Sequence, residues 1–237
     1  MRIIAVVPTY NEAQNVGELI DRLRGLPQGV EVLVADDNSP DGTAQVVRER
    51  AQSDPGVHLL LRTQRKGRGY AGAEGLAEAF EMGAELIIEM DGDLSHRPED
   101  APTLIAAAGQ ADVIIGSRTV RGGRDEGRPW FRRMLTALSC FYARSVLRVP
   151  VGDINSGYRL FNRRVFQRVD PRALFSAGPS IVHEINYRAR LAGLSFAEVP
   201  IRFVERRRGS SELTVGRLID GYLKVLTLWW MHRTGKL

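Results

Sequence analysis

The chain has 237 residues, of which 43% are hydrophobic, so it can bury a full-sized core in one α/β domain with a C-terminal extension. Its 33 basic and 28 acidic residues give a formal charge of +5, and arginines gather within residues 62–68, 118–133 and 202–208, which favours anionic partners such as phosphates, nucleic acid or an acidic membrane leaflet. The single cysteine, Cys140, excludes an internal disulfide and fits a reducing compartment.

The N-terminal half predicts alternating strands and helices. Buried strands are expected at residues 3–7, 30–35, 57–61, 86–90 and 113–115, and helical segments are expected between them. Asn11 with Gln14 is typical of a capping box at the first helix, and Ser39 before Pro40 is typical of an N-cap at the second. This rhythm predicts a mostly parallel, doubly wound sheet flanked by helices.

The C-terminal half predicts a looser series of loops, helices and one strand. The expected segments are a glycine-rich loop at 122–127, a long amphipathic helix, a polar loop at 152–157, a helix near 181–191, a strand at 196–204 and a basic loop at 205–209. The long helix has an apolar stripe made of Phe131, Met134, Leu135, Leu138, Phe141, Tyr142 and Ser145.

The last segment predicts an amphipathic helix from about residue 214. We expect two units, a main domain at residues 1–212 and an interfacial helix with its tail at 213–237. The most apolar stretch of this helix, residues 222–231, is too short to cross a bilayer and contains Lys224. Because residues 3–7 are also too short for the apolar core of a signal peptide, neither a leader nor a spanning helix is expected.

Carboxylates follow three of the predicted strands: Glu12, the pair Asp36 and Asp37, and the pair Asp91 and Asp93. The carboxyl ends of parallel strands meet at one edge of a sheet, where α/β proteins bind ligands. Two aspartates this close repel each other unless a cation lies between them, and a divalent metal carrying a diphosphate meets that need. A surface turn is the alternative, because Asp-Gly is also common in turns.

The segment from Gly67 to Gly72 matches the dinucleotide-binding pattern G-x-G-x-x-G, which leaves a nicotinamide-dependent oxidoreductase as an alternative. The segment Thr63-Gln64-Arg65-Lys66 lies between the strand and Gly67, however, whereas that fingerprint needs the glycines directly at the strand end. We interpret the glycines as letting the backbone and Lys66 approach a phosphate. A non-catalytic module that binds anionic lipid or nucleic acid is a further alternative. The histidines are scattered, which argues against zinc, and His96 is expected at the surface.

Five motifs together resemble the family 2 glycosyltransferases, and within them the members that transfer mannose to a polyprenyl phosphate. The motifs are Pro8-Thr9-Tyr10-Asn11-Glu12, Asp36-Asp37-Asn38-Ser39-Pro40-Asp41-Gly42-Thr43, Met90-Asp91-Gly92-Asp93-Leu94-Ser95-His96, Gly116-Ser117-Arg118 and Ser156-Gly157-Tyr158-Arg159. The resemblance covers nearly the whole chain. It implies a GT-A-like fold, GDP-mannose as donor, a polyprenyl (dolichyl-type) phosphate as acceptor, inversion at the sugar, Mg²⁺ or Mn²⁺ as cofactor and no nucleic-acid partner.

The resemblance also implies roles for individual residues. The nucleotide sugar would be held by Pro8, Tyr10, Glu12, Ala35, Asp37, Lys66, Asp91, Gly92, Asp93, Arg118 and Arg206. The metal would be held by Asp91 and Asp93, the lipid phosphate by Arg118, Arg132 and Thr136, and catalysis would rest on Asp93, Arg118 and Arg132. The chain departs from the family at Ser95, where some relatives offer glutamine, and at Glu212, where the family has lysine.

The chemistry of the acceptor gives an independent argument. A lipid phosphate is ionised at neutral pH and needs no general base, whereas a hydroxyl acceptor requires one, for which Asp153 is the best candidate. The same fold acting on another sugar nucleotide or on a hydroxyl therefore stays open. Trp229, Trp230 and the arginines around Trp130 predict contact with a membrane surface or a small membrane-anchoring subunit, and the alternative is that Trp229 and Trp230 cover the core or a dimer contact. We expect a cytoplasmic protein attached peripherally to the inner face of a membrane.

Overall fold

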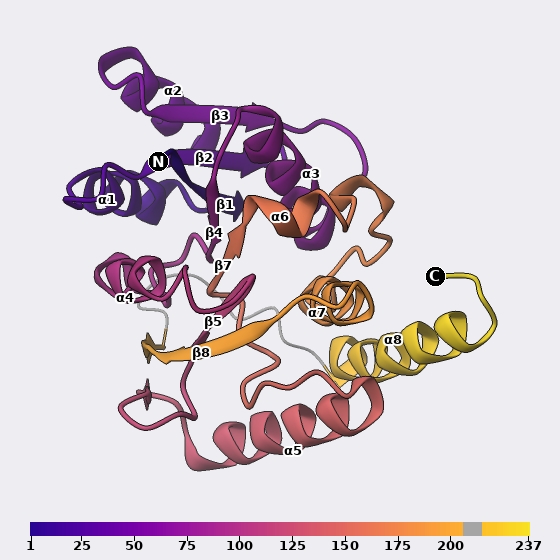
Figure 1. The fold of residues 1–237 in the computed structure, drawn as a ribbon. Coiled ribbons are helices and arrows are strands. Elements are labelled where there is room, and N and C mark those ends of the chain that lie inside the picture. The colour runs from indigo at the N-terminus through magenta and orange to yellow at the C-terminus, as the bar shows by residue number, and fades with distance from the viewer. Residues whose placement is uncertain (206–214) are drawn as a thin grey trace.

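The computed structural model describes the backbone of residues 1–205 and 215–237 and the side chains of residues 1–205 and 221–237. Its centre is a sheet with strand order β3-β2-β1-β4-β7-β5-β8 (Figure 1). The strands are β1 (Ile3–Thr9), β2 (Glu31–Asp36), β3 (Val57–Leu61), β4 (Leu86–Glu89), β5 (Val113–Ser117), β6 (Arg124–Glu126), β7 (Arg159–Asn162), β8 (Phe196–Pro200) and β9 (Arg202–Val204). The predicted mostly parallel sheet is confirmed.

Helices cover both faces of the sheet (Figure 1). They are α1 (Ala13–Arg24), α2 (Thr43–Ser53), α3 (Arg68–Glu81), α4 (Ala101–Ala106), α5 (Trp130–Leu147), α6 (Arg163–Phe166), α7 (Ile181–Leu191) and α8 (Val215–Arg233), with short 3₁₀ turns at Pro98–Asp100 and Pro171–Ala173. Successive side chains of a strand point to opposite faces. Ile3 and Val7 of β1 therefore belong to the core under α1, α2 and α4, while Ile4 and Val6 belong to the core under α3, α7 and α8.

Strand β7 is antiparallel to both of its neighbours, β4 and β5. The sequence placed no strand there, because the four residues of β7 run on directly from a polar loop. Its direction has a consequence for the site: Arg159, at the start of β7, lies opposite Glu89, at the end of β4. The loop before β7 thus reaches the same edge of the sheet as the Asp91–Asp93 pair.

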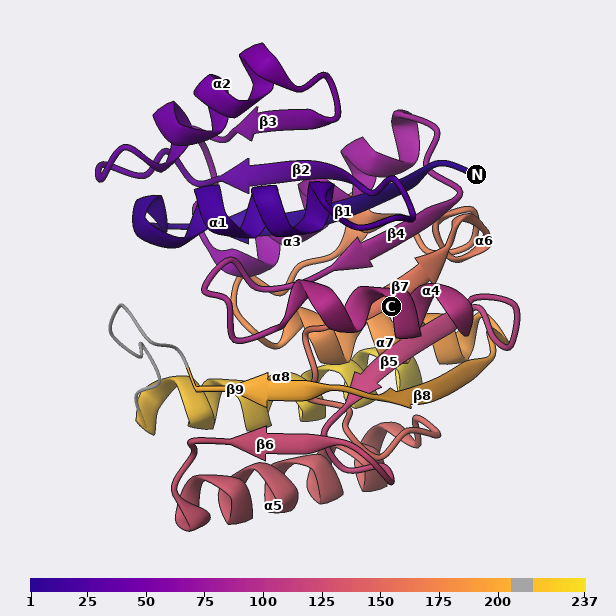
Figure 2. The ribbon, with the colours of Figure 1, turned by 90° about the vertical axis from the view of Figure 1, so that its left-hand side faces the viewer.

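The predicted strand at 196–204 is divided at Ile201 into β8 and β9. Strand β8 extends the main sheet beside β5, whereas β9 pairs with β6 in a separate two-stranded ribbon. Figure 2 shows this ribbon between the main sheet and α5. The segment 122–127, which we expected to be a loop, therefore contains a short strand that closes one side of the carboxyl edge.

Helix α5 presents most of its apolar stripe to solvent. The large side chains of α5 that are exposed are Trp130, Phe131, Met134, Leu135, Leu138 and Phe141, and Trp130 and Phe141 are 74% and 71% exposed. Fewer side chains of α5 are buried, and they are Cys140, Ala143 and Leu147. Helix α8 packs beside α5 and exposes Leu223, Leu226, Trp229 and Trp230. We name the exposed apolar side chains of these two helices the α5–α8 surface.

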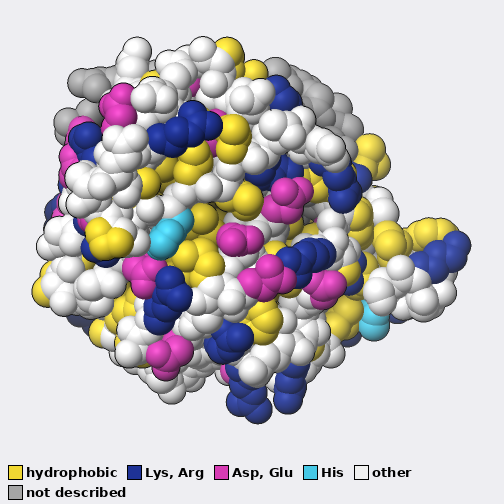
Figure 3. All heavy atoms as spheres, turned by 90° about the horizontal axis from the view of Figure 1, so that it is seen from above, with side chains coloured by type: hydrophobic (Ala, Val, Ile, Leu, Met, Phe, Trp, Pro, Cys, Tyr) yellow, Lys and Arg dark blue, Asp and Glu magenta, His cyan; other side chains and the backbone are white. Residues whose placement is uncertain are grey.

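The opposite end of the molecule has a different surface. Figure 3 looks onto the β3 edge of the sheet and shows basic and acidic side chains interspersed with hydrophobic ones. In the parts of the chain that the structure describes, neither α5, α8 nor any shorter helix combines the length and the apolar character needed to cross a bilayer.

Candidate active site

The loops after β1 and β2 are joined by a row of hydrogen bonds. The backbone N–H groups of Asn11, Glu12 and Ala13 donate to Ser39 Oγ, Thr43 Oγ1 and Asp41 Oδ2 at 3.0, 2.9 and 3.0 Å. Asp41 Oδ1 also accepts from the backbone of Thr43. The orphan N–H groups at the start of α1 are thus satisfied by the second loop. The capping box of Asn11 and Gln14 and the N-cap at Ser39 were wrong, because α1 and α2 begin at Ala13 and Thr43.

Asp37, a predicted nucleotide ligand, is buried at the end of β2. Its carboxylate accepts a hydrogen bond from Gly67 N at 2.6 Å and pairs with the buried guanidinium of Arg62, a partner that the sequence did not indicate. Close by, Lys66 Nζ lies 5.9 Å from the ring centroid of Tyr10, which is 47% exposed. Asp37, Lys66 and Tyr10 therefore lie close together, and their role in nucleotide binding stays a prediction. Pro8 and Ala35 are buried neighbours on β1 and β2.

The glycine motif packs against protein, not against open space. A Cβ at Gly69 would lie 2.0 Å from the carbonyl oxygen of Ser176, and one at Gly67 would lie 2.6 Å from that of Ala177. Gly69 N donates to the Ala177 carbonyl at 2.8 Å. These contacts explain the glycines as packing residues between α3 and the loop before α7. The interpretation that they admit a phosphate was wrong, since both N–H groups already have protein partners.

The predicted metal pair lies just beyond β4, with Asp93 buried and Asp91 partly exposed. Asp93 Oδ1 accepts from Ser95 N at 3.0 Å, so Ser95 serves the site through its backbone. Gly92 is tightly enclosed, because a Cβ there would lie 3.0 Å from Thr9 Cγ2. Arg68, which the sequence analysis missed, donates from Nε to Asp91 Oδ1 at 3.0 Å and from Nη2 to the same oxygen.

His96 is buried beneath this pair, and the expectation of a surface histidine was wrong. Its Nδ1 accepts from Asp91 N at 3.1 Å, and its ring stacks on Tyr158 with 5.1 Å between centroids. Burial lowers the pKa of His96, in spite of the nearby carboxylates. A neutral imidazole is what this contact needs, because Nδ1 must keep a lone pair to accept the backbone N–H.

A fully buried ion pair between β4 and β7 lies next to the Asp91–Asp93 pair. Glu89, the last residue of β4, pairs with Arg159 of β7, and neither side chain is exposed. Arg68 Nη1 lies 3.7 Å from the other carboxylate oxygen of Glu89. Arg159 stood inside a motif, but nothing in the sequence indicated that its partner would be Glu89, 70 residues earlier.

Arg118 and Asp153 form a second buried ion pair beside the acidic pair. Asp153 Oδ2 accepts from the Arg118 backbone N–H at 3.0 Å and from Nε at 2.7 Å, and Oδ1 accepts from Nη2 at 2.7 Å. Burial alone would raise the pKa of Asp153, but the hydrogen bonds and charge of Arg118 outweigh it and hold that pKa below its usual value. Asp153 is therefore a poor proton acceptor, and its clearest role is to orient Arg118.

Arg128 and Arg132 lie with Arg118 on the side of the site that faces the β6–β9 ribbon. Arg118 and Arg128 lie 5.2 and 5.6 Å from the ring centroid of Phe203, on β9, so this ring holds both guanidinium groups together. Arg128 also donates to Thr136 Oγ1 at 3.0 Å. The predicted residue Arg132 pairs with Glu205 at 3.1 Å near the surface. Arg206 and Glu212 lie outside the described residues.

The donor set fits a divalent cation that shares its coordination with a substrate. In residues 1–205 and 221–237, no three His, Cys, Asp or Glu side chains are grouped closely enough to hold a metal on their own. Mg²⁺ and Mn²⁺ suit oxygen ligands, and Mg²⁺ is commonly bound by one or two carboxylates with substrate phosphates and water. The Asp91–Asp93 pair supplies such carboxylates, and the guanidinium on Asp91 shows that this position already attracts a cation.

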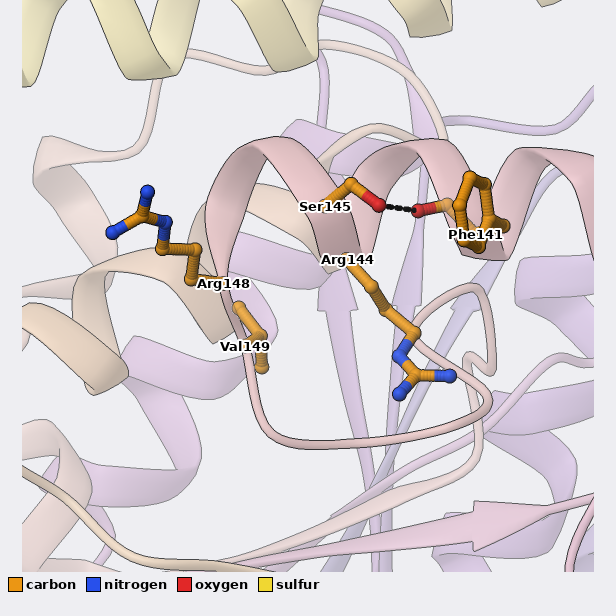
Figure 4. Close-up of a pocket in the computed structure, with 5 residues that line it drawn as sticks. All are labelled: Phe141, Arg144, Ser145, Arg148 and Val149. Atoms are coloured by element: carbon orange, nitrogen blue, oxygen red, sulfur yellow. Dashed lines mark hydrogen bonds between the residues drawn. The ribbon is translucent and has the colours of Figure 1, made fainter.

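A shallow pocket of about 410 Å³ at the C-terminal end of α5 is separate from this set of residues. It is lined by Phe141, Arg144, Ser145, Arg148 and Val149. Figure 4 shows the Arg144 and Arg148 side chains extending away from each other, so their guanidinium groups do not converge on one point. Because its lining includes none of the acidic or nucleotide residues above, we place the active site at the carboxyl edge of the sheet.

Comparison with known proteins shows which family the chain belongs to. The chain is 38% identical to an undecaprenyl-phosphate mannosyltransferase of Micrococcus luteus, over 97% of this chain and 94% of the relative. It is 37% identical to a polyprenol monophosphomannose synthase of Mycolicibacterium smegmatis, over 94% of this chain and 85% of that relative. Its fold resembles glucosyl-3-phosphoglycerate synthase from Mycobacterium tuberculosis, crystallised with Mn²⁺ and UDP, with a TM-score of 0.68 at 20% identity over 99% of this chain and 80% of that one. Residues 4–170 match the model of glycosyl transferase family 2, and the chain belongs to that family.

Proposed function

We propose that this protein transfers mannose from GDP-mannose to a polyprenyl phosphate with inversion. The names of the two relatives support the sugar and the class of acceptor. The observation that carries the proposal is the ion pair of Arg118 and Asp153. The carboxylate best placed to act as a base is bound by three hydrogen bonds to an arginine, so the site favours a nucleophile that is already ionised. A phosphate meets that requirement, and a sugar hydroxyl does not.

The residues of the chain divide the work of binding and charge stabilisation. Tyr10, Glu12, Asp37 and Lys66, with the backbone near Pro8 and Ala35, hold the nucleotide. Asp91 and Asp93, with Gly92 between them, hold Mg²⁺ or Mn²⁺. This cation, when bound, stabilises the negative charge that develops on the leaving diphosphate.

The arginines on the ribbon side of the site hold the acceptor phosphate. Arg118, oriented by Asp153, and Arg132 present fixed positive charge to both phosphate groups, and such preorganised charge lowers the barrier of the transfer. Thr136 contributes by holding Arg128 beside them. Arg206 completes this set in our proposal, although it lies outside the described residues.

The α5–α8 surface brings the enzyme to its lipid substrate. In a soluble protein, exposed apolar patches of this kind commonly mark interaction sites. Trp130, Trp229 and Trp230 suit the headgroup region of a bilayer, where aromatic side chains are enriched. We propose peripheral attachment of α5 and of the C-terminal unit at 213–237 to the inner face of a membrane. Since α5 begins near Arg128 and Arg132, this attachment places the lipid phosphate beside the arginines.

A donor and acceptor panel tests the proposal. Purified protein with Mn²⁺ is given GDP-mannose or UDP-glucose, each with undecaprenyl phosphate or with undecaprenol, and glycolipid formation is measured. We expect product from GDP-mannose with the phosphorylated lipid alone. Transfer to undecaprenol would contradict the phosphate acceptor, and transfer from UDP-glucose alone would contradict the donor. A thermal-shift response to NAD in place of both nucleotides would overturn the assignment.

A further inference from the structure

We infer that Arg68 is an internal counter-cation that occupies Asp91 until a divalent metal displaces it, and that its guanidinium group then turns to Glu89. This inference rests on the metal site of the proposed function. Arg68 would make the acidic pair stable without metal and would weaken metal binding until the donor diphosphate adds its own ligands. It is a positioning residue, because it acts on the reaction through Asp91.

The contacts of Arg68 define the two positions. Its Nε and Nη2 donate to Asp91 Oδ1, while its Nη1 faces Glu89 Oε1 at 3.7 Å. Both of these facing atoms are buried, and neither hydrogen-bonds to any residue that the structure describes. Buried polar atoms without a hydrogen bond are costly, and these two atoms face each other as an ion pair at a distance too long for a hydrogen bond. A small rotation of the guanidinium away from Asp91 would form that bond.

Two glycines leave room for the guanidinium at each position. A Cβ at Gly157 would lie 3.0 Å from Arg68 Nη2 and 3.7 Å from Asp91 Oδ1. A Cβ at Gly72 would lie 3.1 Å from Glu89 Oε1. Any larger side chain at either position would crowd one of the two arrangements, so the backbone is shaped to accept both.

The charge of Arg68 requires movement and excludes simple loss of a proton. Burial opposes the charged form, but Asp91 and Glu89 more than offset it and hold the pKa of Arg68 above its usual value. A guanidinium does not deprotonate in proteins, so a cation that takes its place on Asp91 must push it elsewhere. The second oxygen of Glu89 is held by Arg159, which keeps the receiving carboxylate fixed.

Mn²⁺ binding without nucleotide tests the inference, measured from the loss of the free Mn²⁺ signal in electron paramagnetic resonance. Arg68→Met removes the competitor, and we expect affinity to rise roughly tenfold, the effect of one charged hydrogen-bonded contact. Glu89→Gln removes the receiving charge, and we expect affinity to fall several-fold. Arg172→Met, which removes an exposed arginine paired with Glu81, controls for net charge and should leave affinity unchanged.

The outcomes separate this inference from the proposed function. If the wild type binds Mn²⁺ and Arg68→Met binds it equally or less tightly, the inference fails and the metal site stands. If neither protein binds Mn²⁺, even with GDP present, both fail. If Arg68→Met does not fold, the Glu89→Gln protein decides, because unchanged or tighter binding there contradicts the receiving position. Thermal melts establish that each variant is folded.

Discussion

The buried pair of Arg118 and Asp153 limits what each residue can do in the reaction. Asp153 has no exposed surface, and its carboxylate accepts three hydrogen bonds from Arg118 and one from Cys140 Sγ at 3.8 Å. The backbone N–H groups of Gly152 and Asp153 donate in turn to Glu198 at 2.6 and 3.0 Å, which anchors the loop to β8. The guanidinium is thus oriented by a loop that is anchored to the sheet, and such preorganisation is what the role proposed for Arg118 would need.

Asp153→Asn gives a prediction at this scale. The variant cannot orient Arg118 by charge, and we expect the rate of mannose transfer to fall by about 10²-fold. Because the low pKa of Asp153 keeps it ionised near neutrality, the wild-type rate should not depend on titration of this group from about pH 6 to 9. Rates of both proteins are measured across that range. A wild-type ionisation that disappears in the variant would show that Asp153 acts as a base.

The sequence predicted the acidic residues of the site better than their partners. Asp37, Asp91 and Asp93 follow buried strands, and that position can be read locally. Arg68 and Arg159 could not be assigned, because an arginine gives the same local signal whether it is buried on a carboxylate or solvated. Which applies depends on contacts with residues far away in the chain, such as Asp91 for Arg68 and Glu89 for Arg159. His96 was misplaced for the same reason, since Tyr158, far along the chain, covers its ring.

Helix α5 is amphipathic in the reverse of the usual sense. Its apolar residues follow a helical period, which sequence reasoning detected, but most of the large ones face outward while Cys140, Ala143 and Leu147 contact the core. Periodicity reveals a stripe and not its direction. Direction is set by what lies opposite, here the loop carrying Asp153 and the N-terminal half of α8, where Tyr142 Oη donates to the Tyr222 carbonyl at 3.2 Å.

The outward face of α5 gives a prediction at the scale of the element. We expect the double variant Leu138→Glu with Phe141→Glu to keep its thermal stability, since both side chains are exposed, and to lose flotation with liposomes that contain anionic lipid. Leu191→Glu, an equivalent change on α7, is the matched control and should float like the wild type. Equal flotation of the double variant and the wild type would remove α5 from the membrane contact.

At the scale of the whole molecule, antiparallel β7 connects the N-terminal part of the sheet to β5 and β8. The alternation of strands and helices predicted the N-terminal half well, and in the C-terminal half the helix expected near 181–191 is present as α7. The ribbon of β6 and β9 and the insertion of β7 were missed, because short strands carry too few residues for a period to be seen. Their positions depend on long-range pairing that no local pattern records.

The acid sensitivity of the fold gives a prediction at this scale. Burial and the nearby charge of Arg159 lower the pKa of His183 from 6.5 to about 4, and its Nε2 lies 2.7 Å from Asn155 Oδ1. In the unfolded chain this histidine is protonated below about pH 6.5, whereas in the folded chain it stays neutral until about pH 4. Because the unfolded state binds the extra proton between these values, the free energy of unfolding decreases as the pH falls through that window.

His183→Gln removes this titration and keeps a donor toward Asn155. We expect its urea midpoint to fall less than that of the wild type between pH 7 and pH 4.5 (roughly one His linkage). His232→Gln, at an exposed position on α8, is the control. The linkage would be disproved by identical losses of stability in His183→Gln and the wild type.

The row of hydrogen bonds between the first two loops has a mechanical consequence. Asn11, Glu12 and Ala13 each donate to a side chain of the 39–43 segment, so neither loop can shift without carrying the other. Tyr10 and Glu12 on the first loop and Asp37 at the start of the second would therefore move together if they bind a nucleotide as proposed. A substitution at Ser39, Asp41 or Thr43 would let the two loops move independently, although the side chains of Tyr10, Glu12 and Asp37 would be unchanged.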